Sequence, residues 1–383
     1  MITRIKSENI ILRDGISGGF VYFEGGKIRA VTREELPFDE EIDATDRYVS
    51  PGFIDLHTHG AGGYNFSEST ASVINAANTH LTHGTTSLLP TLSAAPIKSM
   101  ARATEYIKEA MQDAATLPNI LGAHLEGPYF NPEYCGAQKT EFITPPIRED
   151  YEPLLEKYSD VIARVSYAPE LDTDNEFLSE LKKHGILASA GHTGARYSDM
   201  DRAIGGGLSL ITHLYSCTST VTREFGFRHP GVIETAFLRD DIYAEIIADG
   251  KHLPYELIRL VVKVKGADKV ALITDSLCVA GLDTDGGKFD NPNFIIEDGV
   301  CKLPDRSAFA GSICTADRCV REVYHGAGLP LFEAVKMMSA IPAEILGIKK
   351  GRLEADYDAD IVIFDENISV ELAIVGGEKK YER

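Results

Sequence analysis

Eight short apolar runs, separated by longer amphipathic stretches, constrain the fold of this chain more than any other feature. Residues between the runs, for example 69–83, 96–112, 147–158, 173–184 and 254–264, carry apolar side chains at three- and four-residue spacing, which is typical of helices. Strands that alternate with helices form parallel sheets. Eight such units predict an α/β fold, a (β/α)₈ or TIM barrel. The runs cover residues 48–59, 85–91, 120–128, 162–170, 185–193, 208–216, 243–252 and 269–276.

The two ends of the chain have a different pattern. Residues 2–49 alternate polar and apolar side chains between turns, with a hairpin signal at "EGGK", and residues 351–383 alternate in the same way. Either segment alone would form a marginal sheet. We therefore expect residues 1–49 and 347–383 to form one small, discontinuous β-sandwich domain beside a barrel domain over 50–346. A Gly- and Asp-rich loop over 281–294 and helices within 315–325 and 331–346 should follow the eighth run.

Charge and targeting signals restrict the class of partner. The chain has 58 acidic and 38 basic residues and a formal net charge of −20, which disfavours binding to nucleic acid or to an anionic membrane. Its N-terminus lacks the apolar core of a signal peptide, and the six cysteines show no CxxC spacing, so we expect a cytoplasmic protein with reduced thiols. An anionic small-molecule substrate would need local Arg, Lys, metal or backbone N–H groups.

Polar side chains stand at the carboxyl ends of the runs, which meet at one mouth of a barrel. A single strand-end histidine is more often a hydrogen-bonded structural residue than a ligand. His57 and His59, however, lie two positions apart in one strand and point to the same face. Histidine together with carboxylate favours Zn²⁺ and other divalent first-row metals, so the pattern predicts a metal site. The strand-end residues are His57, His59, His124, Glu126, His192, His213, Asp249, His252 and Asp275, of which His124 is as readily a packing residue as a ligand.

Several motifs resemble those of the amidohydrolase superfamily and, within it, of the N-acetylglucosamine-6-phosphate deacetylase family. The motifs span nearly the whole chain and include "PGFIDLHTHG", "HLEGPYFNPEYCGA", "SAGHT", "THLYS", "IIADGKH" and "LITDS". The resemblance implies one or two divalent ions per chain, with Zn²⁺ expected first and Fe²⁺, Mn²⁺ or Co²⁺ as alternatives. It also implies the ligands: Glu126, His192 and His213 for the main ion, and His57 and His59, with Glu126 bridging, for a second.

The resemblance further implies a reaction, the metal-dependent hydrolysis of an N-acetyl amide on an amino-sugar phosphate. N-acetylglucosamine-6-phosphate would give glucosamine-6-phosphate and acetate. A divalent metal polarises the amide oxygen and lowers the pKa of a water molecule. Asp275 would accept the proton of that water and later deliver it to the departing amine. His252 matches a family histidine that hydrogen-bonds the substrate near the reacting carbonyl.

The residues expected to bind the substrate depart in part from the family's pattern. Arg228, in "RHPG", matches an arginine that contacts phosphate, often across a subunit interface, so we expect a homodimer. Where the family usually has Asn-Ala, this chain has Ser216 and Cys217, and the loop from there to Arg228 is longer. Gln138, after Ala137, replaces a common histidine that contacts the sugar. These differences affect substrate recognition and leave the metal ligands unchanged.

Two alternatives stay open. The chain could be a deacylase of another N-acylated amino sugar, such as N-acetylgalactosamine-6-phosphate. It could also be a non-catalytic sugar-phosphate-binding homologue, although such a protein has no need of Asp275. Superfamily members that use a carboxylated Lys on the fourth strand or a catalytic Glu after the fifth are disfavoured, because "RVSYAPE" has no lysine and "HTGARYSD" has no glutamate.

Overall fold

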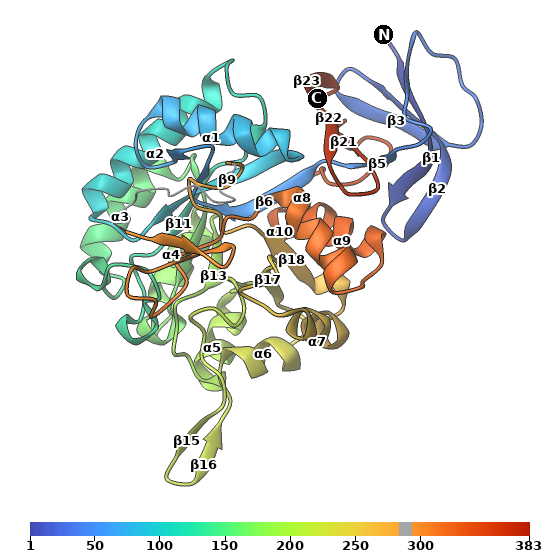
Figure 1. The fold of residues 1–383 in the computed structure, drawn as a ribbon. Helices are drawn as coiled ribbons and strands as arrows, with labels where there is room; N and C mark the ends of the chain where they lie inside the picture. Colours follow the sequence, from blue (N-terminus) through green and yellow to red (C-terminus); the bar gives the residue numbers. More distant parts are fainter. Residues whose placement is uncertain (283–292) are drawn as a thin grey trace.

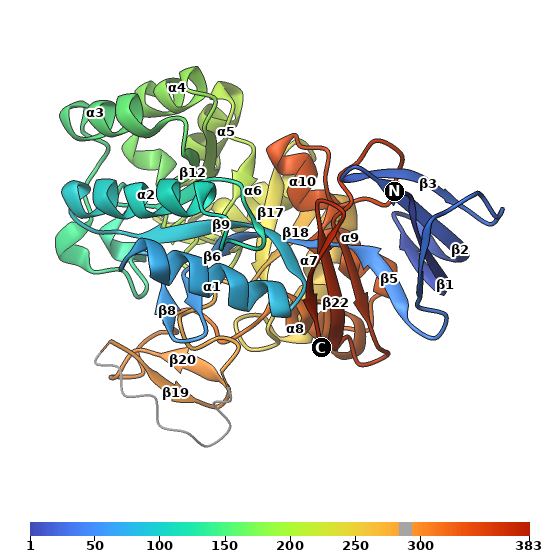
Figure 2. The same cartoon turned by 90° about the horizontal axis from the view of Figure 1, so that it is seen from above.

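The computed structural model of the protein describes residues 1–282 and 293–383, so most of the loop expected over 281–294 lies outside the described residues. A large α/β part stands beside a smaller β-rich part, which contains both ends of the chain (Figure 1). The helices of the larger part lie around the outside of its strands (Figure 2).

The larger part is the predicted barrel. Its strands are paired in chain order and every pair is parallel. Nearly all their residues are buried, because helices cover the outer face of the sheet while side chains fill its interior. Each predicted run coincides with one strand of the barrel, and the fold class is confirmed. The strands are β6 (Phe53–Thr58), β9 (Thr85–Ser93), β11 (Ala123–Glu126), β12 (Ile162–Tyr167), β13 (Leu187–Ala190), β14 (Leu210–Ile211), β17 (Tyr243–Ile247) and β18 (Val270–Ile273), with the short β10 (Asn119–Ile120) also on β9.

The crossover helices bury an apolar stripe against the strands. In α1 the buried side chains include Val73, Ala76, Ala77 and Leu81, at the three- and four-residue spacing of one helix face. Two short helices, α5 and α6, lie where no helix was specified from the sequence. The helices of the barrel are α1 (Thr70–Thr82), α2 (Ile97–Gln112), α3 (Arg148–Tyr158), α4 (Glu176–Lys183), α5 (Tyr197–Gly206), α6 (Val232–Leu238) and α7 (Tyr255–Lys265).

The helical region expected after the eighth strand is present in the structure. The segment 331–346 contains two helices, α9 (Leu331–Met338) and α10 (Ala340–Leu346), which are separated by the non-helical backbone of Ser339. The segment 315–325 contains α8 (Ala316–Arg321), followed by a π-helical turn at Glu322–Gly326. Three short hairpins lie outside the two main sheets: β7 (Gly60–Ala61) with β8 (Tyr64–Asn65), β15 (Thr222–Glu224) with β16 (Phe227–His229), and β19 (Ile295–Glu297) with β20 (Val300–Lys302).

Strands from both ends of the chain form the small sheet. It is one continuous sheet that folds over on itself, since the N–H of Ala359, before β21, donates to the carbonyl of Gly26 in the β2–β3 turn at 2.8 Å. Ile5, Val21, Ile361 and Ile374 belong to the apolar core that its strands share. The strands are β1 (Thr3–Leu12), β2 (Gly15–Glu24), β3 (Lys27–Thr32), β4 (Glu40–Asp43), β5 (Tyr48–Pro51), β21 (Ile361–Phe364), β22 (Val370–Val375) and β23 (Glu378–Glu382).

The first apolar run, expected as one strand over 48–59, is divided between the two sheets. Its first part is β5, which pairs with β1 and β21, and its second part is β6, which pairs with β9. Gly52 lies between them, and a side chain there would collide with Thr86 of β9. The N–H of Gly52 donates to the carbonyl of Asp360 at 2.9 Å. The chain therefore leaves the small sheet and enters the barrel at a glycine that permits a close backbone approach.

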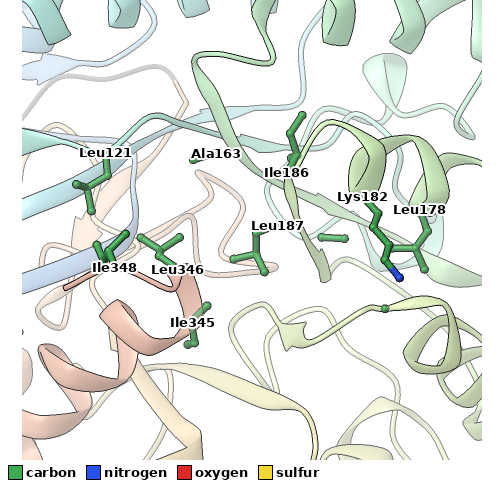
Figure 3. A pocket seen from close by; sticks show the side chains of 12 residues that line it. Leu121, Ala163, Leu178, Lys182, Ile186, Leu187, Ile345, Leu346 and Ile348 are labelled. Carbon is green, nitrogen blue, oxygen red and sulfur yellow. The ribbon is translucent and has the colours of Figure 1, made fainter. Parts of the chain in front are cut away.

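An apolar cavity of about 420 Å³ lies at the amino ends of barrel strands, opposite the ends that carry the predicted site. Leu121, Ile186 and Leu187 line it from the barrel, and Ile345 and Ile348 line it near the end of α10 (Figure 3). Among the residues that the structure describes, no carboxylate or imidazole lines this cavity, and we assign it no chemistry. In residues 1–282 and 293–383, the helices are all too short or too polar to serve as membrane spans.

Candidate metal centre at the mouth of the barrel

Six predicted side chains come together at the carboxyl ends of the barrel strands. Glu126 is the last residue of β11, and His192, His213 and Asp275 each stand two residues beyond the end of a strand. His57 and His59 stand at the end of β6. The parallel arrangement of the strands is the reason for this convergence, since it points every carboxyl end to the same mouth.

Glu126 is the centre of the cluster. Its Oε1 lies 3.1 Å from Nε2 of His192, 3.1 Å from Nε2 of His213 and 3.4 Å from Nε2 of His57. Its Oε2 lies 3.3 Å from Nε2 of His59. The side chain of Glu126 is only 3% exposed, so a single buried carboxylate faces four imidazole nitrogens.

Asp275 completes a second, overlapping group. Its Oδ1 lies 3.4 Å from Nε2 of His57 and 3.2 Å from Nε2 of His59. Within the described residues, two sets of potential ligands have all their ligand atoms within 4.8 Å of one another: His57, His59 and Asp275, and His57, Glu126 and His213. Neutral imidazoles and carboxylates in this arrangement fit a divalent cation.

Contacts behind the cluster orient the imidazole rings. Nδ1 of His192 donates to the carbonyl of Tyr134 at 2.9 Å, and Nδ1 of His213 donates to the carbonyl of Ser216 at 3.1 Å. Nδ1 of His59 lies 3.1 Å from the hydroxyl of Ser93. A carbonyl only accepts, so the proton of a neutral His192 or His213 sits on Nδ1 and the lone pair of Nε2 points to Glu126. This is the tautomer that a metal ligand requires.

The backbone at this site is strained. His192, His213 and Asp275 have φ values of 49°, 27° and 47°, in the left-handed region that residues with a side chain seldom adopt. Each such residue costs on the order of 1–3 kcal/mol and persists only where the surrounding structure determines it. Three of them in one cluster indicate that the barrel holds these side chains in place at the expense of stability.

Burial and charge act in opposite directions on the acids. Burial favours the neutral form of Glu126, but His57, His192 and His213 outweigh it and hold the pKa of Glu126 well below its ordinary value. Asp275 behaves in the same way: burial alone would raise its pKa, yet His57 and His59 keep the pKa below the ordinary value. Both carboxylates are therefore anionic near neutral pH and available to a cation.

The imidazoles respond to the two anions. Burial lowers the pKa of His59, but its hydrogen bonds to Asp275 and Glu126 reverse the effect and raise that pKa to about 10. For His192 burial is likewise outweighed, by Cys217 and Glu126, and its pKa lies well above the ordinary value. For His57 burial dominates, and its pKa is lowered. Without a cation, the cluster balances its charge by keeping protons on some of its imidazoles.

His252, predicted to contact the substrate, is held by Asp249. Oδ2 of Asp249 accepts from Nδ1 of His252 at 2.8 Å, and its Oδ1 accepts from the backbone N–H of Lys251 and of His252. Burial opposes the charged form of His252, but Asp249 outweighs it and raises the pKa of the imidazole. Asp249 was noted in the sequence only as a strand-end carboxylate, and the structure identifies it as the partner of His252.

His124 packs behind the cluster and is not part of it. Its Nε2 lies 2.7 Å from the hydroxyl of Ser166, and its Nδ1 lies 3.1 Å from the hydroxyl of Thr91. Both ring nitrogens are therefore occupied, and the ring stands edge-on to His57 with centroids 4.6 Å apart.

Deeper in the barrel, Arg164 and Glu245 form a fully buried ion pair.

The residues predicted to bind substrate are only partly near the cluster. Nε2 of Gln138 donates to Oε2 of Glu126 at 2.6 Å, and Cys217 contacts His192. Ala137 is exposed in the loop before Gln138. Ser216 contributes its backbone carbonyl to His213, as described above. Arg228 is exposed on β16, in the hairpin that projects from the body, and is not brought to the cluster (Figure 1).

The sequence reasoning missed Ser93 and the carbonyl of Tyr134, which orient His59 and His192. Ser93 could have been found, because it ends β9, and the second apolar run was taken to end two residues earlier. The carbonyl of Tyr134 carries no signal in the sequence, since every residue has one.

Comparison with known proteins agrees with the geometry of the site. A sequence model of the amidohydrolase family matches residues 48–382. The chain is 32% identical to N-acetylglucosamine-6-phosphate deacetylase from Bacillus subtilis, over 97% of this chain and 94% of that protein. The solved structure of N-acetylglucosamine-6-phosphate deacetylase from Pasteurella multocida has a TM-score of 0.91 and 30% identity and covers 100% of both chains.

A further solved structure, that of a mutant of the Mycobacterium smegmatis N-acetyl-D-glucosamine-6-phosphate deacetylase in complex with N-acetyl-D-glucosamine-6-phosphate, has a TM-score of 0.89 and 26% identity over 99% of both chains. The family predicted from the motifs is thus confirmed. The chain belongs to the amidohydrolase family and, within it, to the N-acetylglucosamine-6-phosphate deacetylase family.

Proposed function

We propose that this hydrolase removes the acetyl group of N-acetylglucosamine-6-phosphate and releases glucosamine-6-phosphate and acetate. The observation that carries the proposal is the cluster of four imidazoles around Glu126, with Asp275 beside it. Proteins that are similar to this chain over nearly its whole length are named N-acetylglucosamine-6-phosphate deacetylase.

The ligand set supports a divalent ion. Glu126, His192 and His213 would hold the main ion, and His57 and His59, which share Glu126, would hold a second. When bound, the ion supplies Lewis acidity that polarises the amide carbonyl and makes a water molecule more acidic. We propose Zn²⁺, because imidazole and carboxylate ligands suit it, with Fe²⁺, Mn²⁺ and Co²⁺ as the alternatives.

Metal content tests the number of ions. Protein purified without added chelator should hold about two ions per chain by elemental analysis if both ligand sets are filled. His57→Asn should then remove one of them, because His57 is a proposed ligand of the second ion and not one of the three proposed ligands of the main ion. A single ion in the parent protein that His57→Asn leaves unchanged would contradict the two-metal arrangement.

Two side chains would handle the proton and the substrate carbonyl. Asp275 is anionic and faces the cluster, so it can take a proton from the attacking water and pass it to the amine nitrogen as the C–N bond breaks. His252 donates through Nδ1 to Asp249, and its raised pKa favours the imidazolium, which can donate from Nε2 to a substrate oxygen.

An assay of amine and acetate release identifies the substrate. The protein, saturated with Zn²⁺, should act on N-acetylglucosamine-6-phosphate in preference to its galactosamine epimer and to the unphosphorylated sugars. Preference for the galactosamine epimer would support the second candidate function, a deacylase of N-acetylgalactosamine-6-phosphate. The residues that favour this candidate are Gln138, Ser216 and Cys217, because they depart from the family's pattern. Absence of turnover with every one of these sugars would refute the proposed activity.

We also propose that the protein acts as a homodimer in which Arg228 binds the phosphate of a substrate held by the other copy. Arg228 and Arg223 are cross-strand neighbours on the projecting β15–β16 hairpin, and both are exposed (Figure 1). At its tip Phe225 is 94% exposed and Phe227 is 72% exposed. An apolar tip beside two arginines suits contact with a second copy of a chain whose net charge is −20.

Mixing two inactive variants tests this arrangement. Asp275→Asn keeps Arg228, and Arg228→Ala keeps Asp275, so a mixed dimer contains one complete site if the arginine acts across the interface. Equal mixing should restore about one quarter of all sites, because half of the dimers are mixed and each has one complete site. Light scattering should give the mass of a dimer. A monomer, or a mixture as inactive as its components, would refute the arrangement.

We further propose a cytoplasmic location. All six cysteines are free thiols in the structure, which suits a reducing compartment. Fractionation of the source cells, followed by detection with an antibody, should place the protein with cytoplasmic markers, and recovery with membranes or outside the cell would refute this.

A further inference from the structure

The barrel closes between its last strand, β18, and its first, β6, and this closure differs from the other contacts between neighbouring barrel strands. Each other pair is joined by a parallel ladder. In the described part of the chain, no such ladder joins β6 to β18. Two backbone hydrogen bonds join the segments at the mouth instead: the N–H of Asp275 donates to the carbonyl of His57 at 2.8 Å, and the N–H of His59 donates to the carbonyl of Ser276 at 2.8 Å.

The side chain of Asp55 occupies the same gap one step below. Its Oδ2 accepts from the hydroxyl of Thr274 at 2.6 Å. Its Oδ1 accepts from the backbone N–H of Thr274 and of His57, each at 3.3 Å. Asp55 and Thr274 are both fully buried. The carboxylate of Asp55 thus accepts hydrogen bonds from backbone N–H groups, as backbone carbonyls do at the other strand pairs. It contacts both Thr274, the residue before Asp275, and the backbone of His57.

A second set of side chains spans the gap on its α1 side. The hydroxyl of Thr58 lies 2.8 Å from Nε2 of His80, in α1, and 2.8 Å from the hydroxyl of Ser276. The hydroxyl of Ser276 in turn donates to the carbonyl of Gly60 at 3.0 Å. Thr58 stands between His57 and His59, and Ser276 follows Asp275. The separation of the two histidines from the proton-transfer residue is therefore set by side chains across this gap together with the two backbone hydrogen bonds at the mouth.

We infer that Asp55, through its hydrogen bond to Thr274, is a positioning residue for the reaction: it holds Asp275 at its working distance from His57 and His59. This inference rests on the proposed function and concerns how the same site is assembled. A displacement of a reacting group by even about 1 Å can cost on the order of 100-fold in rate. We call the hydrogen bonds of Asp55 with Thr274 and His57 the clamp. The clamp therefore has an effect on the rate that is separate from its contribution to folding.

Thr274→Val tests the clamp with little change in shape, because valine keeps both branches of the side chain and lacks only the hydroxyl. Thr274→Ser is the conservative partner, since it keeps the hydroxyl and loses a methyl group. The matched control is Thr104→Val in α2, where an equally buried threonine donates only to the carbonyl of Met100 in its own helix. Melting temperature is measured for all three variants.

At saturating Zn²⁺, Thr274→Val should lower kcat by about 10- to 100-fold, the range typical for groups that orient metal ligands. KM for N-acetylglucosamine-6-phosphate should stay near the parental value, since Thr274 is buried beneath the site. Thr274→Ser should recover most of kcat, and Thr104→Val should keep it. A parental kcat in Thr274→Val, or an equal loss in the serine variant, would overturn the inference, because the hydroxyl would then have no positioning role.

Two additions keep the test decisive. If Thr274→Val does not fold, Asp55→Asn replaces it, because an amide cannot accept at every atom where the carboxylate does, and the same loss of kcat is expected. Zn²⁺ affinity, measured by chelator competition, is the readout that does not need the sugar. Zn²⁺ affinity should weaken in Thr274→Val but not in Thr104→Val, because Asp55 also contacts the backbone N–H of His57, a proposed ligand of the second ion. Inactivity of the parent protein would refute the proposed function. Equal Zn²⁺ affinities in Thr274→Val and the parent protein would refute the positioning role of the clamp.

Discussion

Asp275→Asn separates proton transfer from every other role of this residue. The backbone N–H of Asp275 donates to His57 and its carbonyl accepts from Ser312 at 2.8 Å, and both bonds survive the substitution. Asparagine also tolerates the φ of 47°, whereas alanine would add about 1–2 kcal/mol of backbone strain. The variant should therefore fold and keep its metal while losing the group that accepts and returns the proton.

The expected loss follows from what general acid–base catalysis contributes. A positioned proton-transfer group is worth about 10²- to 10⁴-fold in rate, which corresponds to roughly 2.7–5.4 kcal/mol at about 1.36 kcal/mol per decade. We expect kcat to fall by that factor, with KM little changed. Asp275 lies within 3.4 Å of His57 and His59, so a water molecule at the cluster would be within its reach.

The measurement is acetate release from N-acetylglucosamine-6-phosphate, with metal content and melting temperature recorded on the same samples. Asp356→Asn is the matched control, because Asp356 also has a left-handed backbone, with a φ of 70°, but is exposed beside β3 of the small sheet. Turnover within tenfold of the parental value, at full metal content, would contradict the role of Asp275. A loss of metal in Asp275→Asn would show that the residue acts mainly as a ligand.

Two further predictions concern pH and stability. Because the pKa of His59 is raised to about 10 in the metal-free site, its imidazole is protonated at neutral pH, and a metal must displace that proton. Zn²⁺ affinity of chelator-treated protein should therefore rise with pH between about 7 and 10, and calorimetry in two buffers should detect proton release; a pH-independent affinity would count against this. Glu245→Gln leaves the fully buried Arg164 without its counter-ion and should cost about 3–5 kcal/mol in urea unfolding. The more exposed pair of Arg47 and Glu371 is the control, and Glu371→Gln should cost less than about 1 kcal/mol; equal losses in the two variants would refute the reasoning.

Local pattern was sufficient for the barrel. Each strand is a short apolar run between helices, and this alternation is visible without any long-range information. The division of the first run at Gly52 was missed because apolar residues occur on both sides of it. It depends on the side chain of Thr86, which comes from another strand.

The candidate site was predictable in its residues and not in its contacts. Parallel strands place their carboxyl ends together, so His57, Glu126 and Asp275 could be grouped from their positions alone. That His124 faces Thr91 and Ser166 instead of the cluster depends on which neighbouring strand supplies a hydroxyl. The contact between Gln138 and Glu126 depends on how a loop folds back, for which the sequence has no periodic signal.

By itself, then, the sequence determined which chemical groups stand at the mouth of the barrel, because strand ends and residue types are local properties. The tertiary structure decided which nitrogen of each imidazole is free, how far Asp275 stands from His57, and how Asp55 and Thr274 bridge the first and last strands. These depend on strand register and on left-handed backbone at His192, His213 and Asp275. Both are imposed by packing between segments that are distant in the chain, and so no local pattern encodes them.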